Sequence, residues 1–281
     1  MKALRLAWLA FQRFHAHSGP DRAAAVAYYT LLSLLPLLIF AISLGMAVAG
    51  SFDAAYGATV FLLQGVIVHM DHDTMQTLRE FVERAVQFRW ASIVLLAWTA
   101  RRCFSALFSA LSAVFEVKAR GFAGGNLMAL TMVVVTGAGL MVSLALTTLR
   151  ATFEGLFARY APVIIGAAGF LHRLLDLVLT TVVPVIIAMT FFFMVYRFVP
   201  KRVVSSRDAL IGALLATVMW EGAQKGFAYY VRNLTHYAGL YGTLEGLIVL
   251  ALWLELSVSI ILYCGEVVAL LIRSRNGEPG A

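Results

Sequence analysis

Residues 23–49 read AAAVAYYTLLSLLPLLIFAISLGMAVA, and this stretch decides the class of the fold. No charged residue lies between Arg22 and Asp53. A helix needs about 20 mostly apolar residues to cross the hydrocarbon core of a membrane, so the stretch is long enough for one span. Pro36 lies within it and is expected to bend the helix, because it weakens one backbone hydrogen bond.

The composition of the whole chain agrees with a membrane protein. Of its 281 residues, 61% are hydrophobic and only 13% are charged, and the mean hydropathy is +0.85. Soluble domains are about half apolar and a quarter charged, so this chain has too few polar side chains to cover a water-soluble fold. The net charge of +7 is attributed to basic cytoplasmic loops beside anionic lipid rather than to nucleic-acid binding. Cys103 and Cys264 both lie in apolar stretches, which argues against a disulfide framework or a cysteine zinc site.

Five further stretches predict membrane-spanning helices, which gives six spans. They are residues 87–103, 122–147, 177–196, 209–231 and 243–270, so residues 23–272 form one transmembrane domain. The second span ends on Arg101 and Arg102, whose long side chains can reach the interface, and its helix is expected to continue beyond them as an amphipathic segment. The predicted fold class is an all-α integral membrane protein, a six-helix transmembrane bundle.

The basic residues predict the orientation of the bundle. Lys and Arg are dense in residues 1–22, 101–120, 197–207 and 273–275. Basic loops stay on the cytoplasmic side, so both termini are predicted to be cytoplasmic (N-in and C-in). On the outer face, residues 59–70 and 163–170 are apolar but too short to cross, and they predict amphipathic or re-entrant segments.

The two ends of the chain are predicted to lie outside the spans. Residues 1–22 lack the apolar core and cleavage site of a signal peptide. Instead, Leu4, Trp8, Phe11 and, less closely, Phe14 share one face of an interfacial helix. This predicts a cytoplasmic amphipathic segment over residues 1–22, and residues 273–281 form a cytoplasmic tail.

Three glutamates lie in the last predicted span, namely Glu245, Glu255 and Glu266. Glu255 and Glu266 are about three helical turns and 16 Å apart on one face, whereas Glu245 is displaced from Glu255 by roughly 80°. A charge at the bilayer centre costs about 2.5–3.5 kcal/mol on insertion scales, so these carboxylates are expected to face the bundle interior or water. They indicate either a polar pathway for an ion, a proton or a lipid head group, or interhelical ion pairs that fix helix packing.

Arginines at the cytoplasmic ends of the spans are candidate partners for these carboxylates. Arg101 and Arg102 are expected to bind an anionic group, either a lipid phosphate or Glu266, and Arg197 is a further candidate for Glu266. His15 and His17 are expected to have no acidic partner beyond Asp21.

Three other residues are weaker candidates for the polar pathway. Glu221 and Lys225 are four residues apart in the fifth span and are expected to neutralise each other, a pairing that is more often structural. Tyr28 could line a cavity beside the bend at Pro36, although tyrosines near a helix end are more often interface residues.

Several motifs together resemble the YihY/virulence factor BrkB family of bacterial inner-membrane proteins. The first span carries Ala25-Val26-Ala27-Tyr28 followed by Ser33-Leu34-Leu35-Pro36, similar to the family's Ala-x-Ala-Tyr and Ser-Leu-x-Pro elements. Further matching positions, in order, are Tyr196-Arg197-Phe198-Val199-Pro200, Gly212-Ala213, Phe227, Tyr230, Tyr241-Gly242, Leu252-Trp253 and Gly265-Glu266. The resemblance covers about residues 23–272 and implies a six-helix protein of the bacterial inner membrane, with the outer segments in the periplasm. The sequence departs from the family at Glu255, where an aromatic or apolar residue is usual, and at Cys264-Gly265.

The resemblance also carries an older ribonuclease label, which the residues do not favour. RNA hydrolysis would need a metal cluster or an acid/base pair beside a basic groove. The string His69-Met70-Asp71-His72-Asp73 lies in a loop predicted to be outside, without a second cluster at ligand spacing. The chain is therefore expected not to be an enzyme and to bind no metal, cofactor or nucleic acid.

The expected function is transport or lipid handling through a polar bundle interior, with anionic lipid head groups as partners. The alternative is a non-transporting envelope scaffold that works through partner proteins or a homo-oligomer.

Overall fold

The computed structural model describes residues 2–53, 86–117, 182–200, 204–234 and 245–276, together with isolated positions within 56–84 and 124–132 and at 178. Its elements are α1 (Lys2–Ala16), α2 (Gly19–Ala49), the 3-10 helix η1 (Val86–Phe88), α5 (Arg89–Val114), α8 (Val183–Phe198), α9 (Ser206–Leu234) and α10 (Glu245–Arg275). No strand occurs among these residues, and the all-helical membrane fold is confirmed.

Three of the described helices are long and apolar enough to cross a membrane. The stretches are Gly19–Phe40 in α2, Ile93–Val114 in α5 and Gly246–Arg275 in α10. Helix α8 is apolar but shorter, with 16 residues, and α9 is long but carries both Glu221 and Lys225. The third predicted span, 122–147, lies almost wholly outside the described residues, as do the outer segments 59–70 and 163–170 and the string from His69 to Asp73.

A tight turn separates α1 from α2 and sets the start of the first span. Ser18 adopts the left-handed backbone region with φ 52°. A Cβ atom at Gly19 would lie 2.3 Å from the Phe14 ring and 2.6 Å from the Phe14 carbonyl oxygen, so only glycine fits. The helix α2 therefore begins at Gly19, four residues before the predicted span, and continues through the buried Pro36.

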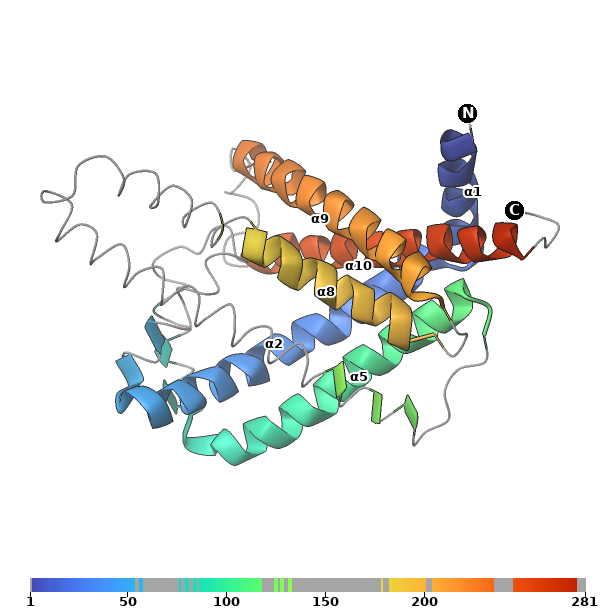
Figure 1. Cartoon of the computed structure of the whole chain (residues 1–281). Coiled ribbons are helices and arrows are strands. Elements are labelled where there is room, and N and C mark those ends of the chain that lie inside the picture. The colour runs from blue at the N-terminus through green and yellow to red at the C-terminus, as the bar shows by residue number, and fades with distance from the viewer. Residues whose placement is uncertain are drawn as a thin grey trace, which may run out of the picture.

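Helix α10 is central to the described bundle, because it contacts α1, α2, α5 and α9. Figure 1 shows α8, α9 and α10 grouped together, with α2 and α5 running as a second pair. Thr30 on α2 links that pair through a contact of 3.1 Å between its Oγ1 and Cys103 Sγ on α5. Both cysteines are free thiols.

The main apolar core lies where the helices meet at one end of the bundle. It joins the start of α2 and α9 to the ends of α5, α8 and α10. The fully buried Tyr196 of α8 donates its hydroxyl hydrogen to the Ile261 carbonyl oxygen at 2.9 Å. Several arginines gather at this same end, which we call the basic end; they are Arg13, Arg22, Arg197, Arg207, Arg273 and Arg275.

Candidate functional site

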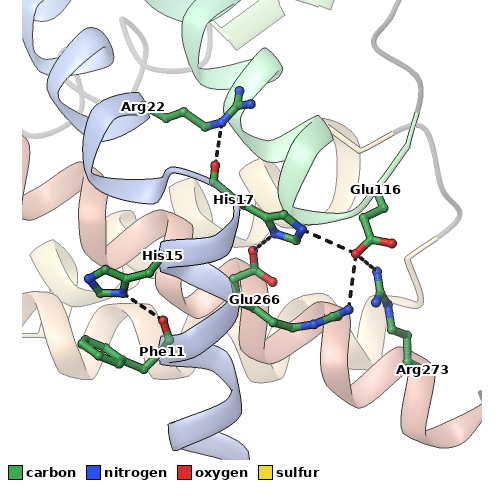
Figure 2. Close-up of polar contacts among 8 residues, drawn as sticks. Phe11, His15, His17, Arg22, Glu116, Glu266 and Arg273 are labelled. Carbon is green, nitrogen blue, oxygen red and sulfur yellow. Dashed lines mark hydrogen bonds and ion pairs between the residues drawn. The ribbon is translucent and has the colours of Figure 1, made fainter. Parts of the chain in front are cut away.

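A buried carboxylate at the basic end is held by a histidine from the opposite end of the sequence. Glu266 on α10 is fully buried, and its Oε1 lies 2.6 Å from Nδ1 of His17, in the turn between α1 and α2. So short a contact is typical of a charge-assisted hydrogen bond. Figure 2 shows His17 placed between Glu266 on one side and Glu116 on the other.

Glu116 is the second carboxylate of this site and lies just beyond the end of α5. Its backbone is left-handed, with φ 49°, which directs the chain away from the helix. Its Oε1 accepts from Nη2 of Arg273 at 2.8 Å and from Nη2 of Arg13 at 3.3 Å, and lies 3.5 Å from Nε2 of His17. These five residues, Arg13, His17, Glu116, Glu266 and Arg273, form the basic-end cluster.

The ring of His17 therefore faces a carboxylate oxygen with each nitrogen. The contact at Nδ1 is a hydrogen bond of 2.6 Å to Glu266, and the contact at Nε2 is a longer one of 3.5 Å to Glu116. The imidazole ring thus links α10 to the end of α5.

The charge of Glu116 is stabilised by its basic neighbours. The hydrogen bond from Arg273 is the largest cause that lowers the pKa of Glu116 below its usual value, and partial burial opposes it. The positive charges of Arg273, Arg13 and His17 lower this pKa further. Glu116 is thus ionised at neutral pH, and it ties α1, α5 and α10 together electrostatically.

Two buried polar atoms of the cluster have no hydrogen-bond partner among the described residues. They are Oε2 of Glu266 and Nη1 of Arg13. An unsatisfied buried polar atom destabilises a fold by about 1–3 kcal/mol, and by more where it is charged.

A second ion pair at the basic end, between Asp208 of α9 and Arg275 of α10, has contacts of 2.8 and 2.9 Å.

The structure corrects the predicted partners of Glu266. Its hydrogen-bond partner is His17, and the prediction that Arg101, Arg102 or Arg197 would hold it is wrong. The inference that His17 lacks an acidic partner is wrong as well. Segments 249 residues apart meet here, and the hydrophobic pattern of the sequence does not encode such a contact.

The two predicted lipid-binding arginines lie on the exposed surface of α5. Arg101 and Arg102 are both exposed, and the guanidinium of Arg102 lies over the Trp98 ring at 5.6 Å. This cation–π contact places Arg102 beside an aromatic side chain of the same helix rather than beside Glu266.

Glu255 differs from Glu266 in its surroundings. It is half-buried on α10 and makes no hydrogen bond or ion pair with any described residue. By helical geometry it shares the face of Ser259 and Glu266. Glu245 is the first residue of α10, and its side chain lies outside the described part.

The weaker candidates are not drawn into the basic-end cluster. Glu221 is half-buried and Lys225 exposed on α9, and no ion pair within 4.0 Å joins them in the described part of the chain. The ion pair that the sequence predicts between them is therefore not formed. Tyr28 is exposed near the start of α2 and meets Tyr29 edge to face, with ring centroids 5.5 Å apart.

Sequence reasoning missed Arg13, Glu116 and Arg273 as site residues. Each of them is a single charged residue in a basic or loop-like segment, and their spacing along the sequence does not indicate that they lie together. The one available signal was that Glu116 is the sole acidic residue between Arg89 and Glu154. Within the described residues, no group of three His, Cys, Asp or Glu side chains is arranged to hold a metal ion.

Comparison with known proteins identifies relatives along nearly the whole chain. A sequence profile described as virulence factor BrkB matches residues 10–281. The ribonuclease-like protein YfkH of Bacillus subtilis (strain 168) is 28% identical over 268 residues, covering 95% of this chain and 94% of YfkH. No solved structure matches.

Other relatives are longer than this chain. The UPF0761 membrane protein RSc1559 of Ralstonia nicotianae is 28% identical over 277 residues, which is 95% of this chain but 59% of RSc1559. A UPF0761 membrane protein of Alkalilimnicola ehrlichii is 28% identical over 264 residues, and the matched part is 55% of that protein. The chain thus spans little more than half the length of these two relatives. The apolar spans and the profile match together show that the chain belongs to the virulence factor BrkB family of membrane proteins.

Proposed function

We propose that this protein transports or handles a lipid or an ion in the bacterial inner membrane, using a polar face inside the bundle, with both termini in the cytoplasm. The observation that carries the proposal is Glu255. It lies within the apolar stretch Gly246–Arg275, about 14 Å along the helix from Gly246. Ionisable residues inside membrane spans are costly and usually functional.

A line of polar side chains supports this role for Glu255. Glu255, Ser259 and Glu266 fall within about 40° of one another around the axis of α10. The line ends at the basic-end cluster, where Glu266 bonds to His17. A proton, a cation or the ammonium or hydroxyl group of a lipid head group could be stabilised at successive points along such a face.

The experiment is reconstitution of the purified protein in phospholipid vesicles. Flux of a fluorescent phospholipid and of protons, the latter read with an enclosed pH dye, is compared for the wild type, Glu255→Gln and Glu255→Asp. We expect flux above that of empty vesicles in the wild type, its loss in Glu255→Gln and partial recovery in Glu255→Asp. Glu83→Gln, an exposed residue outside the three apolar stretches, is the matched control. Equal flux in wild type and Glu255→Gln contradicts the proposal.

A non-transporting scaffold is the second candidate, and the basic-end cluster favours it. There the charges are largely paired and the surrounding core is packed, as expected for a rigid docking surface. Wild-type vesicles with no flux of either probe, combined with co-purification of defined envelope proteins from cross-linked membranes, support this alternative.

The ribonuclease-like name of YfkH belongs to that relative, and we propose that this chain does not cleave RNA. Incubation of the purified protein with tRNA and Mg²⁺ is expected to give no cleavage above a mock preparation. Cleavage that disappears on substitution of His69, Asp71 or His72 contradicts this expectation.

A further inference from the structure

The N-terminal helix α1 presents an apolar face that is exposed in the described part of the chain. Leu4 is 82% exposed, Trp8 60% and Phe11 45%. The opposite face is packed, because Ala10 is buried against Val267 and Leu270 of α10. Large apolar side chains exposed together in this way mark a contact surface.

The depth at which α1 docks indicates what covers this face. Its partners Val267 and Leu270 lie within the apolar stretch Gly246–Arg275 of α10. The Tyr263 hydroxyl, also in that stretch, donates to the Ala7 carbonyl oxygen at 3.2 Å. Figure 1 shows α1 crosswise to α10 near the C-terminal end of that helix. If α10 crosses the bilayer, α1 therefore lies along the membrane plane.

The charge of α1 fits an anionic membrane surface. The first 20 residues contain Lys2, Arg5 and Arg13 and no acidic residue. Arg5 is exposed, next to Leu4. A helix with aromatic and aliphatic residues on one face and basic residues beside it is typical of segments that lie in the head-group region, where basic residues are attracted to anionic lipids.

We propose that α1 is an in-plane membrane helix whose Leu4, Trp8 and Phe11 side chains insert among anionic phospholipids at the boundary between head groups and acyl chains. This contact is separate from the proposed function at Glu255. A protein partner fits the face less well, since a stable interface buries roughly 800 Å² on each side and three side chains cannot supply that area. The His17–Glu266 hydrogen bond and the Ala10 contacts hold the other side of α1 to the bundle.

The test is spin labelling of the full chain in vesicles of phosphatidylethanolamine and phosphatidylglycerol. Single cysteines replace Leu4, Phe11 or Ala16, and the unsubstituted protein measures background labelling of Cys103 and Cys264. Ala16 is the matched control, because it is exposed on the same helix but about 140° around the axis from Phe11 and about 120° from Leu4. Oxygen concentrates among acyl chains, whereas a nickel chelate stays in water.

We expect the ratio of oxygen to nickel collisions to be several-fold higher at positions 4 and 11 than at position 16. High nickel collision rates at positions 4 and 11 place the face in water and overturn the proposal. Low rates for both reagents show coverage by protein and overturn it as well. If the Phe11 variant does not fold, position 4 gives the same readout, since Leu4 makes almost no contact with the bundle.

A separate experiment tests the preference for anionic lipid. With phosphatidylcholine in place of phosphatidylglycerol, or with Arg5→Gln, the ratio at position 4 is expected to fall. An unchanged ratio in both cases overturns the anionic preference, and the result is independent of any flux assay.

Discussion

At the scale of single residues, the bond between His17 and Glu266 carries the strongest energetic consequence. His17→Ala leaves a fully buried carboxylate without its hydrogen-bond donor, and removing one partner of a buried charged pair costs about 3–5 kcal/mol. We therefore expect a lower thermal unfolding midpoint in detergent for this variant. His15→Ala is the control, because His15 is exposed and its one hydrogen bond among the described residues is to the Phe11 carbonyl oxygen of its own helix. Its effect should stay within about 0.5 kcal/mol.

The double variant His17→Ala/Glu266→Gln separates a charge effect from a simple loss of contact. Without the carboxylate no uncompensated charge remains, so the double variant should be more stable than His17→Ala alone. Strictly additive losses would show that the two side chains stabilise the fold independently.

Glu116 predicts a dependence of stability on acid pH. Its pKa is lower in the folded protein than its usual value of 4.5, chiefly through the Arg273 hydrogen bond. Folding thus favours the ionised form, and this contribution is complete above the unfolded pKa and disappears as the pH falls through the folded value. Because the Glu116 side chain is 48% exposed, the contribution should be less than about 1 kcal/mol.

The measurement is the difference in unfolding midpoint between wild type and Glu116→Gln from pH 7 down to pH 3. We expect the wild type to be more stable at neutral pH, and the difference to shrink below about pH 4.5. A difference that is constant over this range contradicts the ionic role of Glu116.

At the scale of single residues, the sequence could predict the surroundings of a residue but not its partner. Glu266 was predicted to be shielded from lipid near the basic end, because an intramembrane carboxylate must avoid hydrocarbon, and it is fully buried there. Its partner His17 could not be predicted, because that contact depends on the turn at Ser18 and Gly19 and on the docking of α1. Whether Glu255 serves a pathway stays a prediction.

At the scale of helices, glycine decides how closely α9 approaches its neighbours. A Cβ atom at Gly212 would lie 2.3 Å from Cγ2 of Val268 and 3.2 Å from Cδ2 of Tyr196. Val268 is β-branched and fully buried, so it cannot rotate away easily. Gly212→Ala should destabilise the protein by about 1–3 kcal/mol through overpacking.

Two glycines on the same helix provide matched controls for Gly212. A Cβ atom at Gly222 or Gly226 would meet nothing within 4 Å. Alanine there should be neutral or stabilising by up to about 1 kcal/mol, since it favours helix more than glycine does. Equal destabilisation by all three substitutions would show that helix propensity, rather than close contact, governs α9.

The helices themselves were largely predictable from hydrophobic pattern, and their ends were less so. The predicted continuation of the helix beyond Arg102 is present in α5, which runs to Val114 with Leu107, Leu111 and Val114 in the core. The stretch of α5 that is apolar enough to cross a membrane is Ile93–Val114 rather than the predicted residues 87–103. The start of α2 at Gly19 rather than residue 23 arises from the contact between Gly19 and Phe14. Such a steric requirement acts through tertiary structure and leaves no periodic signal.

At the scale of the whole molecule, the described helix ends at the basic end constrain the topology. The start of α2 and the end of α5 are both bonded into the basic-end cluster, through His17 and Glu116. The start of α9 and the end of α10 meet through Asp208 and Arg275. Figure 1 shows α1 and the C-terminal end of α10 at this same end. Because these helix ends lie together, an experiment that locates one of them on a side of the membrane also locates the others.

Reporter fusions test the side of the membrane on which this end lies. The positive-inside rule predicts that the basic end lies in the cytoplasm, so fusions at Lys118, at Lys201 and at the C-terminus are expected to report a cytoplasmic location. Fusions near Asp71 and Arg159, in the two long connections of the sequence, should report the periplasm. A periplasmic signal at Lys118, Lys201 and the C-terminus would invert the orientation while leaving the bundle intact. Opposite signals at Lys118 and at the C-terminus would contradict the contact between Glu116 and Arg273, which are only 2.8 Å apart and cannot lie on opposite sides of a bilayer.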